Sequence, residues 1–228
     1  TANRRQRQMC IRDRDWQWYD SVRGVGPAKN LVSNTTYAET ANDDTQYGYT
    51  SSFNKDGFTV TNGTGGGNAN IYTNKNGQTY ASWTWKAGGS KNTFNVDDVG
   101  YASAAAAGIT EGTISLTGAS IGTKQGFSII KYTGNSAASA SIGHGLTQAP
   151  KFIICKNIGI TKDWVVYTEA VGPGNTLYLN KTDAAGGGTG TWGNVSPTST
   201  VFSVGSNSTT NYSGPMIAYC WHDVPGLQ

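Results

Sequence analysis

The sequence predicts an all-β protein made of antiparallel, jelly-roll-like β-sandwich repeats, one of them complete and one truncated at its N-terminus. Only 14% of the 228 residues are charged and 31 are Gly, with abundant Ser, Thr and Asn, which is typical of short strands joined by turns. Short apolar runs are bounded by Gly, Pro and Asn, and four sequence blocks occur twice in the same order. A closed β-barrel is the main alternative to the sandwich.

The first 14 residues are interpreted as foreign to the fold. The string RRQRQMCIRDR, Arg4–Arg14, matches a translation of the transposase adapter used in sequencing libraries. We therefore expect residues 1–14 to be unstructured; the alternative is a genuine basic arm. They carry five Arg and one Asp, which leaves 12 basic and 13 acidic side chains for the rest of the chain. Residues 15–228 are therefore nearly neutral and give no positive field that would attract phosphates, so we expect no binding of nucleic acid.

Residues 15–89 are predicted to form a partial β-sandwich repeat, because they match the second half of residues 126–226 block by block. DWQWYDSVRGVG matches DWVVYTEAVGPG and, after a register shift of two residues, LVSNTTYA matches LYLNKTDA. GFTV then matches VFSV, and YASWTWKAGG matches MIAYCWHDVPG. The ordered set indicates one fold used twice. The paired blocks begin at Asp15 and Asp163, Leu31 and Leu177, Gly57 and Val201, and Tyr80 and Met216.

Residues 126–226 are predicted to form the complete repeat. Upstream of Trp164 they contain GFSIIKYTGN, SASIGHGL and PKFIICKN, three strand-like runs that the first copy lacks. PKFIICKN is apolar on both faces, as in a strand inside a sandwich. Residues 90–125 are rich in Ala, Gly, Ser and Thr and are predicted to be a low-complexity linker with one or two strands.

No catalytic, cofactor-binding or metal-binding set is predicted. His144 lies in a Gly-flanked turn without a neighbouring acid, and His222 falls where the first copy has Lys86, so neither suggests a catalytic triad. Cys155 and Cys220 are expected to be buried thiols, with a disulfide possible but disfavoured. The adjacent carboxylates Asp43–Asp44 and Asp97–Asp98 are expected to be solvated turns, and the two Gly triplets, Gly65–Gly67 and Gly186–Gly188, hairpin loops rather than phosphate loops.

The aromatic content is the one feature that suggests a ligand. Seven Trp and twelve Tyr in a neutral, Asn-rich β protein are typical of surfaces on which aromatic rings stack against sugars. Four aromatic residues lie in variable loop regions and are the candidate ligand contacts: Trp192, Tyr212, Tyr47 and Tyr49. Four others lie in the matched blocks and are expected to pack in the core: Trp16, Trp85, Trp164 and Trp221.

The ordered blocks resemble a repeated β-rich domain of uncharacterised virion proteins, found in tail-fibre and appendage-like proteins of marine phages, especially those of cyanobacteria. The resemblance is carried by GFSIIKYTGN, IGHGLTQAPKFIICKN, DWVVY, LYLN, SPTSTVFSVG and IAYCW within residues 126–226, and by KNTFNVDDVGYASAAAAG from Lys91. It implies a virion location, a role in the adsorption apparatus and further copies beside this one, and it supplies no catalytic residues.

The function expected from these observations is a non-enzymatic structural or adhesion module of a phage tail fibre or similar appendage. Its expected partners are other virion proteins and copies of itself in a homotrimer, with no membrane insertion, because no apolar run approaches the roughly 20 residues that span a bilayer. The alternative is a lectin-like module that binds a host surface polysaccharide. A polysaccharide depolymerase would need two carboxylates across a groove and is disfavoured.

Overall fold

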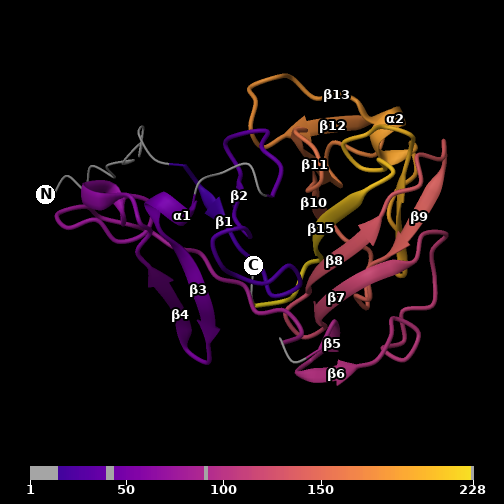
Figure 1. Ribbon diagram of the computed structural model, residues 1–228. Coiled ribbons are helices and arrows are strands. Elements are labelled where there is room, and N and C mark those ends of the chain that lie inside the picture. The colour runs from indigo at the N-terminus through magenta and orange to yellow at the C-terminus, as the bar shows by residue number, and fades with distance from the viewer. Residues whose placement is uncertain (1–14, 40–43, 90–91, 227–228) are drawn as a thin grey trace, which may run out of the picture.

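The computed structural model describes residues 15–39, 44–89 and 92–226 (Figure 1). The interpretation of residues 1–14 as an adapter scar therefore lies outside the described residues, as does Asp43. Within the described part the chain is almost entirely β, with two short α-helices, which confirms the predicted all-β, sandwich-like fold. No helix of this part is long and apolar enough to cross a membrane.

A mixed sheet of nine strands forms the main layer, in the order β13-β12-β11-β10-β15-β8-β7-β5-β6. Its neighbours pair antiparallel except β5 and β7, which are parallel. The strands are β5 (Phe94–Val96), β6 (Val99–Tyr101), β7 (Leu116–Gly122), β8 (Phe127–Thr133), β10 (Phe152–Asn157), β11 (Trp164–Thr168), β12 (Asn175–Tyr178), β13 (Gly186–Gly187) and β15 (Pro215–Trp221).

The central strands are apolar on both faces, so the main sheet has to be covered twice. A two-stranded sheet of β9 (Ala140–Gly143) and β14 (Val201–Val204), together with α2 (Gly188–Trp192), covers the first, inner face. The core between these layers holds Ile130, Tyr132, Cys155, Val165 and Phe202, all buried. This packing of sheet against sheet makes the sandwich.

The prediction that residues 90–125 form a linker is wrong. They supply β5, β6 and β7, and β7 is an interior strand of the main sheet, with Ala119 and Ile121 fully buried. The small residues that resemble a linker have a packing role here. A Cβ added at Gly118 would lie 2.9 Å from Cγ1 of Val22, so the small side chains let another segment approach the sheet closely.

The first two strands of the chain reproduce a hairpin of the main sheet. β1 (Gln17–Trp18) and β2 (Leu31–Val32) pair Gln17 with Val32 and Trp18 with Leu31, and β11 and β12 pair the equivalent residues, Val165 with Tyr178 and Val166 with Leu177. The repeat deduced from the sequence is therefore present in three dimensions at the level of strand register.

The polar contacts of this hairpin are also duplicated. The Trp16 N–H donates to Oδ1 of Asn34 at 2.9 Å, and the Trp164 N–H donates to Oδ1 of Asn180 at 2.9 Å. In each copy the Asn amide also donates to the Asp before the Trp, Asp15 at 3.1 Å and Asp163 at 2.9 Å. The same side chains thus fix the same hairpin twice.

The later blocks of the first copy do not form a second sandwich. Residues 44–80 form a small lobe in which β4 pairs with β3 instead of with a counterpart of β9, and Figure 1 shows this hairpin set apart from the main sheet. Residues 81–86, which match the central strand β15, belong to no strand. The lobe consists of α1 (Asp44–Tyr47), β3 (Tyr49–Asn54), β4 (Gly57–Thr61) and a 3-10 turn at Gly66–Asn68.

The β1–β2 hairpin covers the second, outer face of the main sheet. Leu31 is buried against side chains of this face, and the Trp164 indole N–H donates to the Val32 carbonyl at 3.0 Å. The following segment is held by Lys156, whose ammonium donates to the carbonyls of Thr36 (3.1 Å), Asn157 (3.0 Å) and Lys162 (2.8 Å). Burial lowers the pKa of Lys156 to about 8, so the amine is still mainly protonated at neutral pH.

A buried ionic network completes this contact. Asp20 accepts from Nε of Arg23 at 2.5 Å and from the Tyr219 hydroxyl, on β15, at 2.7 Å. Arg23 also donates to Oε1 of Glu39 at 3.1 Å and to the Lys29 carbonyl at 2.6 Å. Burial opposes the charged form of Arg23, but the facing acids Asp20 and Glu39 raise its pKa. The network ties the first copy to the centre of the main sheet.

We predict that Arg23→Met destabilises the protein by about 3 kcal/mol or more, because it leaves the Asp20 carboxylate buried without its cation. The control is Lys29→Met, which removes an exposed ammonium 3.5 Å from the same Glu39 and should cost less than about 1 kcal/mol. Urea unfolding of both variants measures the difference. If both variants lost the same free energy of unfolding, burial of the network would contribute nothing to stability.

Candidate binding groove

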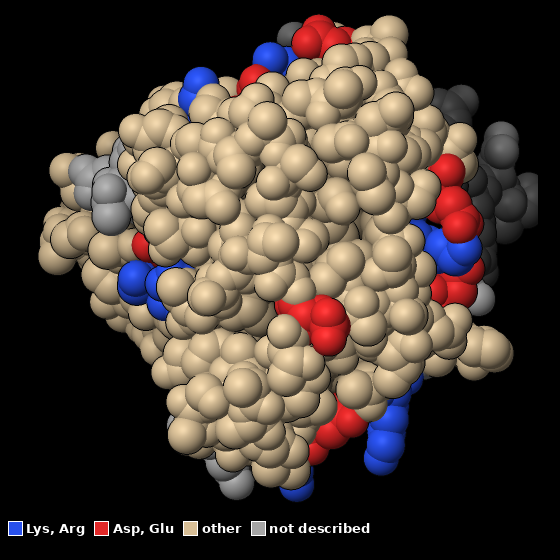
Figure 2. Space-filling view, turned by 90° about the vertical axis from the view of Figure 1, so that its right-hand side faces the viewer, with Lys and Arg blue, Asp and Glu red and all other residues tan. Residues whose placement is uncertain are grey.

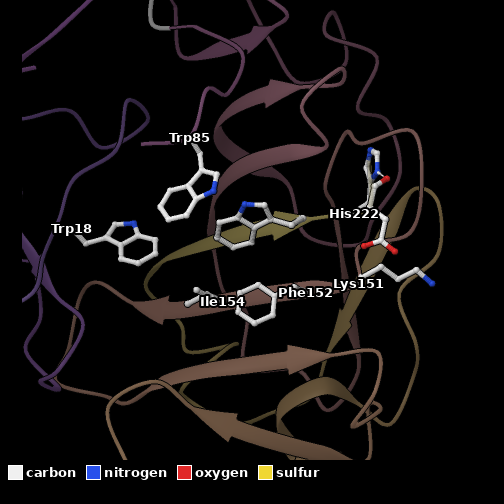
Figure 3. Close-up of a pocket in the computed structure, with 8 residues that line it drawn as sticks. Trp18, Trp85, Lys151, Phe152, Ile154 and His222 are labelled. Carbon is white, nitrogen blue, oxygen red and sulfur yellow. Dashed lines mark hydrogen bonds between the residues drawn. The ribbon is translucent and has the colours of Figure 1, made fainter. Parts of the chain in front are cut away.

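The outer face holds an open groove where the first copy meets the main sheet (Figure 3). Its volume is about 320 Å³. Trp18 and Trp85 line it from the first copy, and Phe152, Ile154 and Trp221 line it from the sheet. Phe152 and Ile154 share a face of β10 because they are two residues apart, and Phe152 lies opposite Trp221 in the register of β10 and β15. Lys151, His222 and Asp223 also line it.

The rings in and beside the groove contact one another in series. The Trp18 and Trp85 centroids are 6.3 Å apart with planes 17° from parallel, and Trp85 lies 6.0 Å from Trp221. Beyond the groove, Trp16 and Trp83 lie 5.7 Å apart. Trp83, Trp85 and Trp16 are 61%, 52% and 45% exposed. A second pair of exposed indoles, two residues along the chain from Trp18 and Trp85, therefore lies outside the groove.

The charged groups near the groove are mostly paired. Lys151 forms an ion pair with Glu169, and Lys86 forms one with Asp98 at 2.6 Å. Nδ1 of His222 lies 2.7 Å from the Asp223 carbonyl oxygen. Elsewhere, Figure 2 shows a face of the molecule on which acidic and basic side chains are few and scattered. The groove thus combines apolar ring faces with nearly balanced charge, which suits an uncharged ligand with both CH and OH groups.

The four candidate contact residues do not form a common site. Trp192 is only 2% exposed and packs in the inner core with its ring 5.9 Å from that of Tyr167, so its prediction as a ligand contact is wrong. Its loop folds inward as α2, with left-handed glycines at both ends. Tyr47 and Tyr49 lie in the small lobe, where Tyr47 contacts Tyr72 at 5.2 Å. Tyr212 is 37% exposed on a loop before β15.

The four tryptophans expected in the core also differ in burial. Trp164 is fully buried, as expected, but Trp16 and Trp85 are exposed and Trp221 lines the groove. Trp18, which also lines the groove, was not among the predicted contact residues. The signal that was available is the spacing Trp16-x-Trp18 and Trp83-x-Trp85, because residues two apart in an extended chain project from one face.

His144, Cys155 and Cys220 have packing roles in this structure. Nδ1 of His144 accepts from the Leu146 N–H at 3.1 Å, which leaves Nε2–H to donate to the Thr198 carbonyl at 3.1 Å. Burial lowers the pKa of His144 to about 4, so its imidazole is neutral at pH 7. Cys155 and Cys220 are buried free thiols, and burial raises the pKa of Cys155 to about 12. The described residues contain no group of three or more His, Cys, Asp or Glu that could hold a metal ion.

Comparison with known proteins gives one family match. The model described as "Domain of unknown function (DUF7483)" matches residues 8–228. No curated protein and no solved structure matches the chain.

The buried imidazole of His144 predicts a loss of stability in acid. An unfolded His titrates near pH 6.5 and the folded one near 4, so the unfolded chain binds more protons as the pH falls between these values. Above pH 6.5 this group does not lower the free energy of unfolding. By pH 4.5 it should lower the free energy of unfolding by about 2 to 3 kcal/mol. Urea unfolding at pH 7 and 4.5 measures the loss, which His144→Gln should reduce; an unchanged loss in that variant would contradict the assignment.

Proposed function

We propose that this chain, which belongs to the DUF7483 family, is a non-enzymatic structural or adhesion module of a phage tail fibre or similar virion appendage. The observation that carries the proposal is the duplicated hairpin, which occurs once inside the main sheet and once docked on that sheet's outer face. A unit whose outer face receives part of a neighbouring unit is suited to an array of repeats. Arrays of this kind build elongated structures such as fibres.

The partners in this proposal are other virion proteins and further copies of the chain. Assembly as a homotrimer would place several weak contacts on one appendage, so that their combined avidity exceeds the affinity of each. The packing roles of His144, Cys155 and Cys220 support a role that involves no bond-making chemistry.

The aromatic groove favours a second candidate function, a lectin-like module that recognises a host surface polysaccharide. Exposed indoles stack on the apolar faces of sugar rings, and the paired charges at the groove leave no strong field to select an acidic polymer. The two candidate functions are compatible, because an appendage that adheres to a host needs both a shaft and a contact surface.

Transposase-free long-read sequencing of the source DNA tests the virion role. We expect the arginine string to be absent from the gene, further repeats to flank residues 15–226, and genes for tail proteins to lie nearby. A complete gene that retains the string among unrelated genes would overturn the proposal.

Affinity electrophoresis in gels that contain neutral polysaccharides tests the groove. We predict that Trp85→Ala raises the dissociation constant obtained from the retardation at least tenfold. This corresponds to about 1.4 kcal/mol of binding free energy, which is reasonable for an indole that stacks on a sugar. The matched control is Phe53→Ala, an aromatic residue of β3 that is 43% exposed and lies outside the groove, and it should bind normally. If both variants bind like the wild type, the groove is not the sugar site.

A further inference from the structure

The sequence block that ends each copy of the repeat, residues 80–86 in the first copy, has a different structural role in the two copies. The counterpart of residues 80–85, Met216–Trp221, lies in β15 at the centre of the main sheet and pairs with β10 on one side and β8 on the other. In the first copy, residues 81–86 belong to no strand and are all exposed. The same block is therefore a fully paired strand in one copy and an exposed segment in the other.

The exposed segment keeps features of a β-strand. Trp83 contacts Trp16, and Trp85 contacts Trp18, so alternate side chains project to one side as in an extended chain. Among the described residues, no backbone hydrogen bond or strand pairing is found for residues 81–86. Such a row of solvated N–H and C=O groups is a template for another strand.

We propose that residues 80–86 form an acceptor site for β-strand addition, and that the strand it accepts has the chemistry of β8, supplied by a neighbouring repeat. The pairing in the second copy identifies this occupant. β15 and β8 match over seven residues, from Pro215 with Thr133 to Trp221 with Phe127, which is the longest register among the described strand pairs. By equivalence, an incoming strand would place its Phe opposite Trp85 and its first Ile opposite Trp83.

The side chains of such a strand suit both faces of the acceptor. Opposite the indoles it presents Phe and Ile, which form favourable cross-strand pairs with aromatic rings. On the other face, Ser82 and Thr84 would meet the partners that Ala218 and Cys220 have in the second copy, Ile130 and Ser128. Strand addition engages the backbone edge of residues 80–86, whereas a sugar would stack on the ring faces in the groove. The inference therefore does not rest on sugar binding, and protection of the amides distinguishes the two.

The structure also indicates which N–H groups would bind the strand. In the second copy, the Trp221 carbonyl accepts from the Lys151 N–H on the side of β10, and the His222 N–H donates to the Gly126 carbonyl on the side of β8. N–H groups alternate along a strand, so that of Cys220 also points toward β8. Thr84 is the counterpart of Cys220, and its N–H should therefore donate to the added strand.

The test uses the full ¹⁵N-labelled chain and a synthetic peptide with the sequence of residues 126–135, GFSIIKYTGN. At saturating peptide we expect at least tenfold slower hydrogen exchange at the amides of residues 81–86 and a blue shift of indole fluorescence. Thr84→Pro, which lacks the N–H, should abolish this protection, whereas Thr84→Val keeps the N–H and should retain it. Residue 84 is exposed, and circular dichroism checks that both variants keep the fold.

A peptide of scrambled sequence controls for non-specific association. Protection that is absent, that is equal with the scrambled peptide, or that survives Thr84→Pro would overturn the proposal. A fluorescence change with a neutral oligosaccharide but no amide protection by the peptide would also overturn it, and would assign these indoles to sugar binding alone.

Discussion

The structure depends on the cover that the first copy provides for the outer face of the main sheet. β15 alternates between the two faces: Met216, Ala218 and Cys220 point to the inner core, while Ile217, Tyr219 and Trp221 belong to the outer cluster. Burial of apolar area stabilises both faces, and the β9–β14 layer can cover only one of them. The β1–β2 hairpin and the Asp20–Arg23 network supply the second cover, so the stability of the sandwich and the position of the hairpin are coupled.

This coupling explains why the groove lies where it does. The hairpin brings Trp18 over Trp164 and Tyr219, with ring centroids 5.6 Å and 5.1 Å apart, but it leaves the ends of β10 and β15 uncovered. Trp85 reaches the same region from the other end of the first copy and contacts Phe127 and Trp221. The groove is the part of the outer face that the first copy leaves uncovered. Its aromatic character comes from Trp18 and Trp85 of the first copy and from Phe152 and Trp221 of the sheet.

The sequence was sufficient for the fold class and for the duplicated hairpin, because both depend on local patterns. Period-two alternation and the Asp-Trp…Asn blocks lead directly to β11, β12 and their copies. It was not sufficient for residues 90–125, whose small side chains fit a linker and a closely approached strand equally well. The burial of Trp192 and the exposure of Trp85 depend on which strands lie beside them, and a repeat alignment carries no information about missing neighbours.

The two copies show how far a sequence block determines its own structure. The Asp-Trp…Asn hairpin forms in both, because its hydrogen bonds close within the hairpin, between the Asp-Trp block and the Asn block. The last block becomes a strand only in the second copy, where β8 and β10 satisfy its backbone on both sides. A central strand has no internal hydrogen bonds, so its conformation is decided by its neighbours. Residues 81–86 therefore keep the side-chain pattern of a core strand on the surface of the protein.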